Sequence, residues 1–435
     1  MIDLARRLSA VLAFVVLIVG VGVPAIAFPQ SHPTLVAPLS HVWDDMPQTA
    51  PYTRYEGPDR YATAVRISQA AHPYAPSQLR PESIYLARGD VFADALAAGT
   101  LRFGQVLLVP SCGTVPTVVL TEIRRLGSPE VVALGGPKAV CDDVLRQAAQ
   151  GVSTRRVGGT NRYATAVAIS QESFRFDDPV EELYIASAAD SPDAVAGGVL
   201  TRGPVLLVPS TGAVPSVVVK EVDRLQPRRV IALGGVKSVS DSVLAQAAQG
   251  RSSDRLAGAD RYGTAVAIAR HEFPRGGREA YIARGDVFAD AIAGGSLNFG
   301  PVLLLPPQCG TVPSVVADYL QTTRSPDPLA ALGGNRAVCY QTLVSAAELA
   351  AIQVSPITLP DAVLGQRYNG QLTAINGIAP FRWSGAGLPP GILLDSSTGL
   401  LSGTPSAAGA FDLGVTTSDS TRRGGWVGLD LTVAP

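Results

Sequence analysis

The sequence predicts an α/β fold, with three tandem small parallel-sheet units followed by an all-β C-terminal module. One heptapeptide occurs three times, as DRYATAV at 59–65, NRYATAV at 161–167 and DRYGTAV at 260–266. Near-continuous apolar runs follow each copy, which is typical of strands buried on both faces of a parallel sheet. After residue 354 the helical pattern ends, and short β-prone runs separated by turn residues replace it. The copies lie too far apart for stacking solenoid repeats, whose periods are roughly 20 to 50 residues.

The first residues have the layout of a secretory signal peptide. Arg6 and Arg7 precede an apolar run over 8–23, and residues 25–27 read Ala-Ile-Ala. An uncleaved membrane anchor is the alternative, because the run is near the lower limit for spanning a bilayer. Under either interpretation the rest of the chain lies outside the cytoplasm. We predict a signal peptide over 1–27 and a Pro-rich linker over 28–53.

The composition indicates a folded chain with almost no net charge. Of the 435 residues, 46% are hydrophobic and 16% are charged, and the formal net charge is −1. Such a chain has no global field that attracts nucleic acid or an anionic membrane, so anion binding has to come from local clusters. The four histidines form no metal-ligand spacing, and GxSxG and HExxH are absent. We therefore expect no cofactor, no metal, no enzymatic activity, no nucleic-acid partner and, after cleavage, no membrane partner.

Each unit is predicted to alternate strands and helices. In the first unit, apolar runs at 83–87, 105–110 and 131–136 predict buried strands. Helical stretches are expected at 60–71, 94–102, 115–126 and 138–149. The other two copies repeat this order, so we expect units over 54–150, 156–249 and 255–350.

The four cysteines support both the repeats and an extracellular location. Cys112 and Cys141 lie in the first unit, and Cys309 and Cys339 occupy the matching positions of the third, whereas the middle unit has neither. Because both cysteines of a unit are present or both are missing, we pair Cys112 with Cys141 and Cys309 with Cys339. Each bond would close a loop of about 30 residues and implies an oxidising exterior. Four free buried thiols are the alternative.

The heptapeptide predicts the start of a helix. Its first residue is a favoured N-cap in every copy: Asp59, Asn161 and Asp260. The arginine that follows opposes the helix dipole, so we expect it to have a negative partner. These arginines are Arg60, Arg162 and Arg261. Two partners remain open: a structural ion pair with an aspartate at the start of the next helix, or an external anion. The aspartates are Asp94, Asp193 and Asp290.

A second candidate anion site follows the third predicted strand of each unit. A glycine pair there precedes a basic residue and is expected to open a helix. Converging backbone N–H groups, a helix terminus and a basic side chain can together hold phosphate or carboxylate. A tight turn with a solvated basic residue is the alternative. The residues are Gly135, Gly136 and Lys138; Gly234, Gly235 and Lys237; and Gly333, Gly334 and Arg336.

Two RGD triplets, at 88–90 and 284–286, would by themselves suggest adhesion. Each triplet lies at the end of a predicted strand inside a repeat, and the middle copy has Ser187 in place of the arginine. We therefore interpret them as parts of the repeat.

The ordered set RYATAV, FADALAAG, VLLVP, VPTVV and VVALGGPKAV, with its two further copies, resembles the cell wall binding repeat 2 family of Gram-positive surface proteins. The resemblance implies a compact pseudo-threefold arrangement of the units. It also implies a secreted, cell-wall-associated protein that attaches non-covalently to an anionic cell-wall polysaccharide or teichoic-type polymer. The heptapeptide arginines, the three aspartates and the glycine pairs match the family's pattern. The middle copy departs from it, with ASAADSPDA where the first has ARGDVFADA.

Residues 355–435 predict a small β-sandwich. The segment GLPPGILLDSSTGLLSGTPSAAGAFDLGVTTSD resembles the immunoglobulin-like (Ig-like) repeat of bacterial surface proteins, which implies a spacer or interaction module. We expect Phe381, Trp383 and Trp426 to form its core. The sequence thus predicts a surface binding protein, and the alternatives are a modifier of a wall hydrolase or an adhesin that uses the repeats as its anchor.

Overall fold

The computed structural model describes residues 52–73, 80–90, 96–101, 104–174, 180–189, 196–274, 276–286, 297, 299–307, 309–323, 329–420 and 424–435. The predicted signal peptide and nearly all of the predicted linker lie outside these ranges, as do Asp94, Asp193 and Asp290. No helix within the described ranges is long and apolar enough to cross a membrane.

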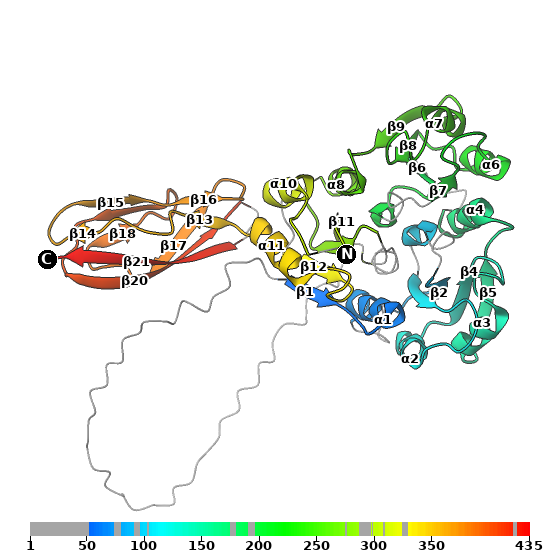
Figure 1. Ribbon diagram of the computed structural model, residues 1–435, viewed down its shortest axis with the longest axis horizontal. Coiled ribbons are helices and arrows are strands. Elements are labelled where there is room, and N and C mark those ends of the chain that lie inside the picture. Colours follow the sequence, from blue (N-terminus) through cyan, green and yellow to red (C-terminus); the bar gives the residue numbers. More distant parts are fainter. Residues whose placement is uncertain are drawn as a thin grey trace, which may run out of the picture. The chain divides into compact units, whose positions relative to one another are not determined.

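The first repeat alternates strands with helices (Figure 1). Its elements are β1 (Tyr52–Tyr55), α1 (Arg60–Ala71), β2 (Ser83–Arg88), the 3₁₀ helix η1 (Leu96–Thr100), β3 (Gly104–Val109), α2 (Thr117–Leu126), β4 (Glu130–Leu134) and α3 (Asp142–Ala149). The helix predicted at 60–71 is confirmed. The helix predicted at 138–149 begins only at Asp142, because the chain first forms a separate turn in which Ala139 N–H donates to the Gly136 carbonyl (2.8 Å).

The second and third repeats contain the same order of elements. The second comprises β5 (Ser153–Val157), α4 (Arg162–Ser173), β6 (Glu182–Ser187), η2 (Gly197–Val199), β7 (Val205–Val208), α6 (Ser216–Leu225), β8 (Arg229–Leu233) and α7 (Asp241–Ala248). The third comprises β9 (Ser252–Leu256), α8 (Arg261–Glu272), β10 (Ala280–Arg284), β11 (Val302–Leu305), α10 (Ser314–Thr322), β12 (Leu329–Leu332) and α11 (Tyr340–Ala350). The predicted three α/β units are confirmed.

Both faces of each sheet are buried, and alternate residues of a strand enter different cores. In β2, Ile84 and Leu86 pack with α2 and α3 in a core local to the first repeat. The neighbours Tyr85 and Ala87 point to the opposite face, into a core that all three repeats share. Tyr184 and Tyr281 have the same place in β6 and β10. The continuous apolar runs therefore arise because each strand serves two cores.

A fourth strand in each sheet belongs to another repeat. β5, which leads into the second repeat, pairs in parallel with β4 of the first. β9 pairs in the same way with β8. The N-terminal strand β1 pairs with β12 of the third repeat, with Tyr55 opposite Leu332. This exchange closes the three repeats into a cycle, in agreement with the predicted pseudo-threefold arrangement. The unit boundaries at 54, 156 and 255 stay a prediction. The strand that leads into each repeat pairs with a strand of another repeat, so a boundary drawn along the chain does not coincide with the edge of a sheet.

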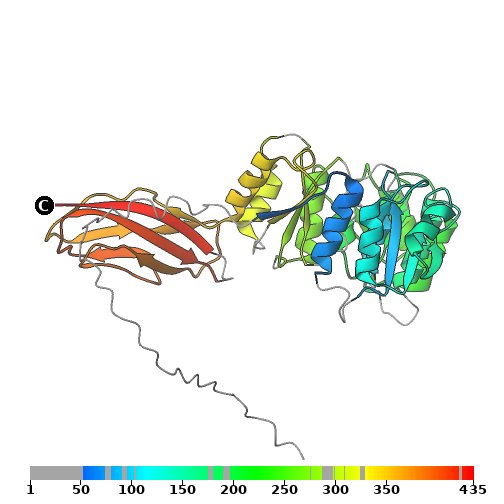
Figure 2. The ribbon, with the colours of Figure 1, turned by 90° about the horizontal axis from the view of Figure 1, so that it is seen from below.

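The C-terminal region contains only strands among its described residues (Figure 2). These are β13 (Gln353–Ser355), β14 (Ala362–Val363), β15 (Tyr368–Gln371), β16 (Thr373–Ile375), β17 (Arg382–Ala386), β18 (Ile392–Leu394), β19 (Leu400–Gly403), β20 (Gly409–Ser418) and β21 (Gly424–Ala434). Two main sheets, of order β14-β21-β20-β17 and β15-β19-β18, enclose a core that includes Trp383, with Phe381 packed against it. Trp426 is half-buried and lies outside that core.

Candidate functional site

The heptapeptide anchors the start of one helix in every repeat. Asp59 Oδ1 accepts the Ala62 N–H at 2.8 Å, and the Thr63 hydroxyl accepts the Gly57 N–H at 3.1 Å. The cap bonds recur at Asn161 (3.0 Å) and Asp260 (2.8 Å). The three predicted N-caps are thus confirmed, and the threonine holds the incoming loop against the first helical turn.

The heptapeptide arginines reach the end of the next strand. Arg60 Nη1 donates to the Gly89 carbonyl, Arg162 Nη1 to that of Ala188 (2.5 Å) and Arg261 Nη1 to that of Gly285 (2.6 Å). Each guanidinium therefore has a backbone oxygen as a partner, although Arg60 and Arg162 remain exposed. Their predicted pairing with aspartates falls outside the described residues.

The glycine pairs form left-handed turns that end before the helix. Gly135, Gly234 and Gly333 have φ values of 83°, 94° and 95°, a region that favours glycine. The expectation that the pair opens a helix is wrong, because α3 begins only after Cys141, which is its N-cap residue. The basic residues of these turns, Lys138, Lys237 and Arg336, are exposed.

The sequence analysis missed one set of arginines that contact the glycine turns. Each member lies on an exchanged strand and donates through Nη1 to the first glycine of another repeat's turn. The pairs are Arg54 to Gly333 (2.8 Å), Arg156 to Gly135 (3.0 Å) and Arg255 to Gly234 (2.7 Å). A signal existed, because an arginine stands six positions before the heptapeptide arginine in every copy. We call these meeting points the first junction (Arg156–Gly135), the second (Arg255–Gly234) and the third (Arg54–Gly333).

At the first junction the two predicted anion sites meet in one pocket of about 880 Å³. The first repeat contributes Arg88, Gly136 and Lys138, and the second contributes Asn161 and Arg162 at the start of α4. The sequence analysis placed the two sites in each unit separately. The exchanged strand instead brings the turn of one repeat to the heptapeptide of the next.

The described lining of the first-junction pocket carries positive side chains. Lys138 and Arg162 lie in its lining, together with the N-terminus of a 12-residue helix, and none of its described lining residues carries a carboxylate. The N-cap of this helix, α4, is the neutral Asn161, whereas the first and third repeats have aspartates at that position. Oriented N–H groups and fixed cations of this kind suit phosphate or carboxylate oxygens.

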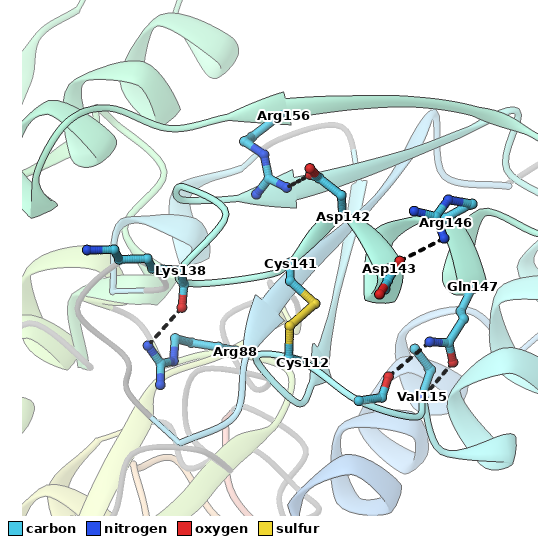
Figure 3. Close-up of a disulfide and its surroundings, with 11 residues drawn as sticks. Arg88, Cys112, Val115, Lys138, Cys141, Asp142, Asp143, Arg146, Gln147 and Arg156 are labelled. Atoms are coloured by element: carbon cyan, nitrogen blue, oxygen red, sulfur yellow. Dashed lines mark hydrogen bonds and ion pairs between the residues drawn. A yellow bond between two sulfur atoms is a disulfide. The ribbon is translucent and has the colours of Figure 1, made fainter.

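The RGD arginine is held inside its own loop. Arg88 makes two hydrogen bonds to the Asp90 carboxylate, both 2.8 Å. Figure 3 shows a longer bond from Arg88 to the Lys138 carbonyl (3.4 Å). Arg284 and Asp286 repeat this pair at 2.6 and 2.7 Å. The arginine and aspartate of each triplet therefore pair with one another, a contact that the sequence analysis did not predict.

Both predicted disulfides are confirmed. Cys112 bonds to Cys141 across 29 residues, and Cys309 bonds to Cys339 across 30. Figure 3 shows the first bond tying the loop after β3 to the residue that precedes α3. At the matching place in the second repeat, Ser240 caps α7 by accepting the Val243 N–H (3.3 Å). In the first and third repeats, the disulfide thus anchors the cysteine that lies between the glycine turn and the helix that follows it.

The pattern of these repeats matches a known family. The family model described as Cell wall binding domain 2 (CWB2) covers residues 54–145, 156–244 and 255–343. The chain belongs to the CWB2 family. A second model, described as "Putative Ig domain", matches residues 350–434. Both family resemblances inferred from the sequence are therefore confirmed.

Curated relatives share the CWB2 region. The chain is 26% identical over 250 residues to N-acetylmuramoyl-L-alanine amidase LytC of Bacillus subtilis (strain 168), a match that covers 56% of this chain and 47% of the relative. It is 24% identical over 253 residues to the Amidase enhancer of the same organism, covering 56% and 33%. The chain therefore spans about half or less of the length of these relatives.

Solved structures support the fold. Cwp6 from Clostridium difficile matches with a TM-score of 0.60 at 22% identity, covering 69% of this chain and 48% of that protein. Cwp8 from Clostridium difficile matches with a TM-score of 0.59 at 19% identity, covering 69% and 51%. CWB2 repeats in this chain thus adopt the three-unit fold found in those proteins.

Proposed function

We propose that this chain is exported, attaches non-covalently to an anionic secondary polymer of a Gram-positive cell wall and displays its Ig-like module there. The pocket at the first junction carries the proposal, because it joins Lys138, Arg162 and a helix N-terminus in a lining whose described residues include no carboxylate. A polymer with repeated phosphate or carboxylate groups, such as a teichoic-type polymer, offers the matching charges. The chain itself is proposed to have no catalytic activity.

We infer that repetition of the binding site around the cycle raises the overall affinity, although each single contact is weak. The first junction places Lys138 beside Arg162 of the next repeat. The other repeats have basic residues at the matching positions, so we infer that one polymer strand can meet several sites on one frame. The sites are not identical, since Ser187 stands where the first and third repeats have Arg88 and Arg284. We therefore infer that the second junction is a weaker site than the first.

A charge-removal experiment tests the proposal. Replacing Lys138, Lys237 and Arg336 together with glutamine should lower affinity for purified wall polymer at least about threefold, since each exposed charge contact contributes about 0.2 to 1 kcal/mol. Lys220, an exposed lysine on α6, provides the matched control. Lys220→Gln should bind like the unmodified chain, and binding of that chain should weaken as salt rises. Equal losses in both variants, or binding indifferent to salt, would contradict the proposal.

Modulation of a wall hydrolase is a second candidate function. The observation that favours it is the likeness of the repeats to the amidase and the Amidase enhancer. In a zymogram on wall material, this function predicts no clearing by the chain alone and altered clearing when an amidase is added. Clearing by the purified chain alone would contradict the absence of catalysis in both candidates.

A further inference from the structure

The third junction differs from the other two at the first residue of the helix that follows the glycine turn. At the first junction that residue is Asp142, which accepts Nη2 of Arg156 at 2.9 Å. At the second it is Asp241, which accepts Nη2 of Arg255 at 2.9 Å. At the third it is Tyr340.

The tyrosine leaves a buried donor without a partner. Arg54 still donates through Nη1 to the Gly333 carbonyl, but its Nη2 is buried and has no hydrogen-bond partner in the described structure. Burial lowers the pKa of Arg54, and the charge of Glu56 only partly opposes this effect. An unpaired buried donor is unfavourable for folding, so Tyr340 does not have the structural role of the aspartates it replaces.

The Tyr340 ring is instead presented to solvent on a fixed support. Its relative exposure is 55%. The ring meets that of Tyr52 edge to face, with centroids 6.3 Å apart and planes at 71°, and the two hydroxyl oxygens are 3.0 Å apart. The Tyr340 N–H donates to Asn335 Oδ1 at 2.7 Å, and the preceding Cys339 is disulfide-bonded. The platform is therefore attached to the turn that carries Arg336.

We propose that Tyr340 and Tyr52 form a platform for one sugar ring of the wall polymer, next to a phosphate or carboxylate held by Arg336. This inference rests on the proposed function and specifies its ligand. The C–H bonds of a pyranose carry partial positive charge and suit the electron-rich face of an aromatic ring. The paired phenol hydroxyls can donate to and accept from sugar hydroxyls. The ligand class is thus a glycan with charged groups between sugar rings, and a polyol phosphate chain without rings would not use the platform.

Tyr340→Asn separates binding from folding. The asparagine can offer Nη2 of Arg54 an acceptor without adding charge, so the melting temperature should stay the same or rise. Affinity should fall about tenfold, the effect of losing one or two aromatic contacts, with an unchanged salt dependence. Three probes are measured by calorimetry: phosphate-containing polymer released from Gram-positive walls, the neutral oligosaccharides that hydrofluoric acid releases from that polymer by cleaving its phosphodiester bonds, and poly(glycerol phosphate). Tyr340→Asn should lower the affinity for both glycans and leave the affinity for poly(glycerol phosphate) unchanged.

Tyr340→Phe and Asp142→Asn are the controls. The phenylalanine keeps the ring and should retain most of the affinity, and Asp142→Asn alters the matching residue at the first junction and should not weaken binding. Unchanged affinity of Tyr340→Asn for both glycans would overturn the platform while leaving anionic attachment intact. Tyr340-dependent binding of the neutral glycan, with no tighter binding of the charged polymer, would support the platform and overturn anionic attachment. Failure of the unmodified chain to bind any probe would overturn both.

Discussion

The first and third junctions share one frame and differ in the chemistry that they present. Both join an exchanged strand to a left-handed glycine turn through an arginine, and both turns are followed by a disulfide-bonded cysteine. The first then has Asp142, which neutralises its arginine, whereas the third has the exposed Tyr340. The comparison teaches that the repeats keep the residues that hold the turn and vary the residue that follows it. Sites of different specificity can therefore lie around one cycle.

The largest expected effect comes from breaking the frame itself. Replacing Cys112 and Cys141 with serine, or Cys309 and Cys339 with serine, should lower the free energy of unfolding by about 3 to 4 kcal/mol in either case. The two losses should be alike because the closed loops span 29 and 30 residues. Urea unfolding measures both. The serine at 141 can cap α3 as Ser240 caps α7, so the loss reports the cross-link. A loss below about 1 kcal/mol for only one pair would show that the two frames are not equivalent.

A smaller effect is the response to acid of the contact between Glu182 and His271. Between the second and third repeats, Glu182 Oε2 accepts from Tyr184 Oη (2.7 Å) and lies 2.7 Å from His271 Nε2. Burial acts to raise the pKa of Glu182, but the hydrogen bonds from Tyr184 and His271 and nearby positive charge outweigh it, so the pKa is lowered from its ordinary value of 4.5.

A carboxylate with a lowered pKa stabilises the fold above its unfolded-state pKa, and this contribution is lost as pH falls through the folded-state value. Urea unfolding between pH 7 and pH 3 should therefore show a decline below about pH 4.5 that Glu182→Gln makes shallower. The matching contact between the first and second repeats provides the comparison, because Glu172, at the position that matches His271, accepts there from Tyr85 Oη (3.1 Å) and Arg155 Nη1 (2.9 Å). An identical acid response in Glu182→Gln and the unmodified chain would show that this carboxylate does not contribute.

Much of the fold could be predicted from the sequence because both faces of each repeat's sheet are buried. A strand such as β2 enters two cores, so it reads as an uninterrupted apolar run. The joint presence of cysteines predicted both disulfides, and the side-chain chemistry of Asp59 and its counterparts predicted the caps. The fourth strands were missed because residues such as Ser153 and Thr154 on β5 are exposed and polar, and their partners lie in another repeat.

The residues of the candidate site could be predicted from the sequence, but their proximity could not, because it depends on contacts between repeats. Lys138 and Arg162 were both identified, but nothing within one repeat shows that the turn of the first lies beside the heptapeptide of the second. Only the strand exchange brings them together. The role of Tyr340 depends on a comparison of matching positions, which becomes meaningful once Arg156 and Arg255 are seen to contact the aspartates at those positions.

The three lysines of the chain allow one direct test of where the polymer binds. Lys138 and Lys237 lie on junction turns, and Lys220 lies on an exposed part of α6. Acetylation of the folded chain with and without purified wall polymer, read by mass spectrometry, reports the accessibility of each amine. The account predicts that polymer slows acetylation of Lys138 most and of Lys237 less, and leaves Lys220 unchanged. Protection of Lys220 alone, or equal rates at all three lysines with polymer bound, would contradict binding at the junctions.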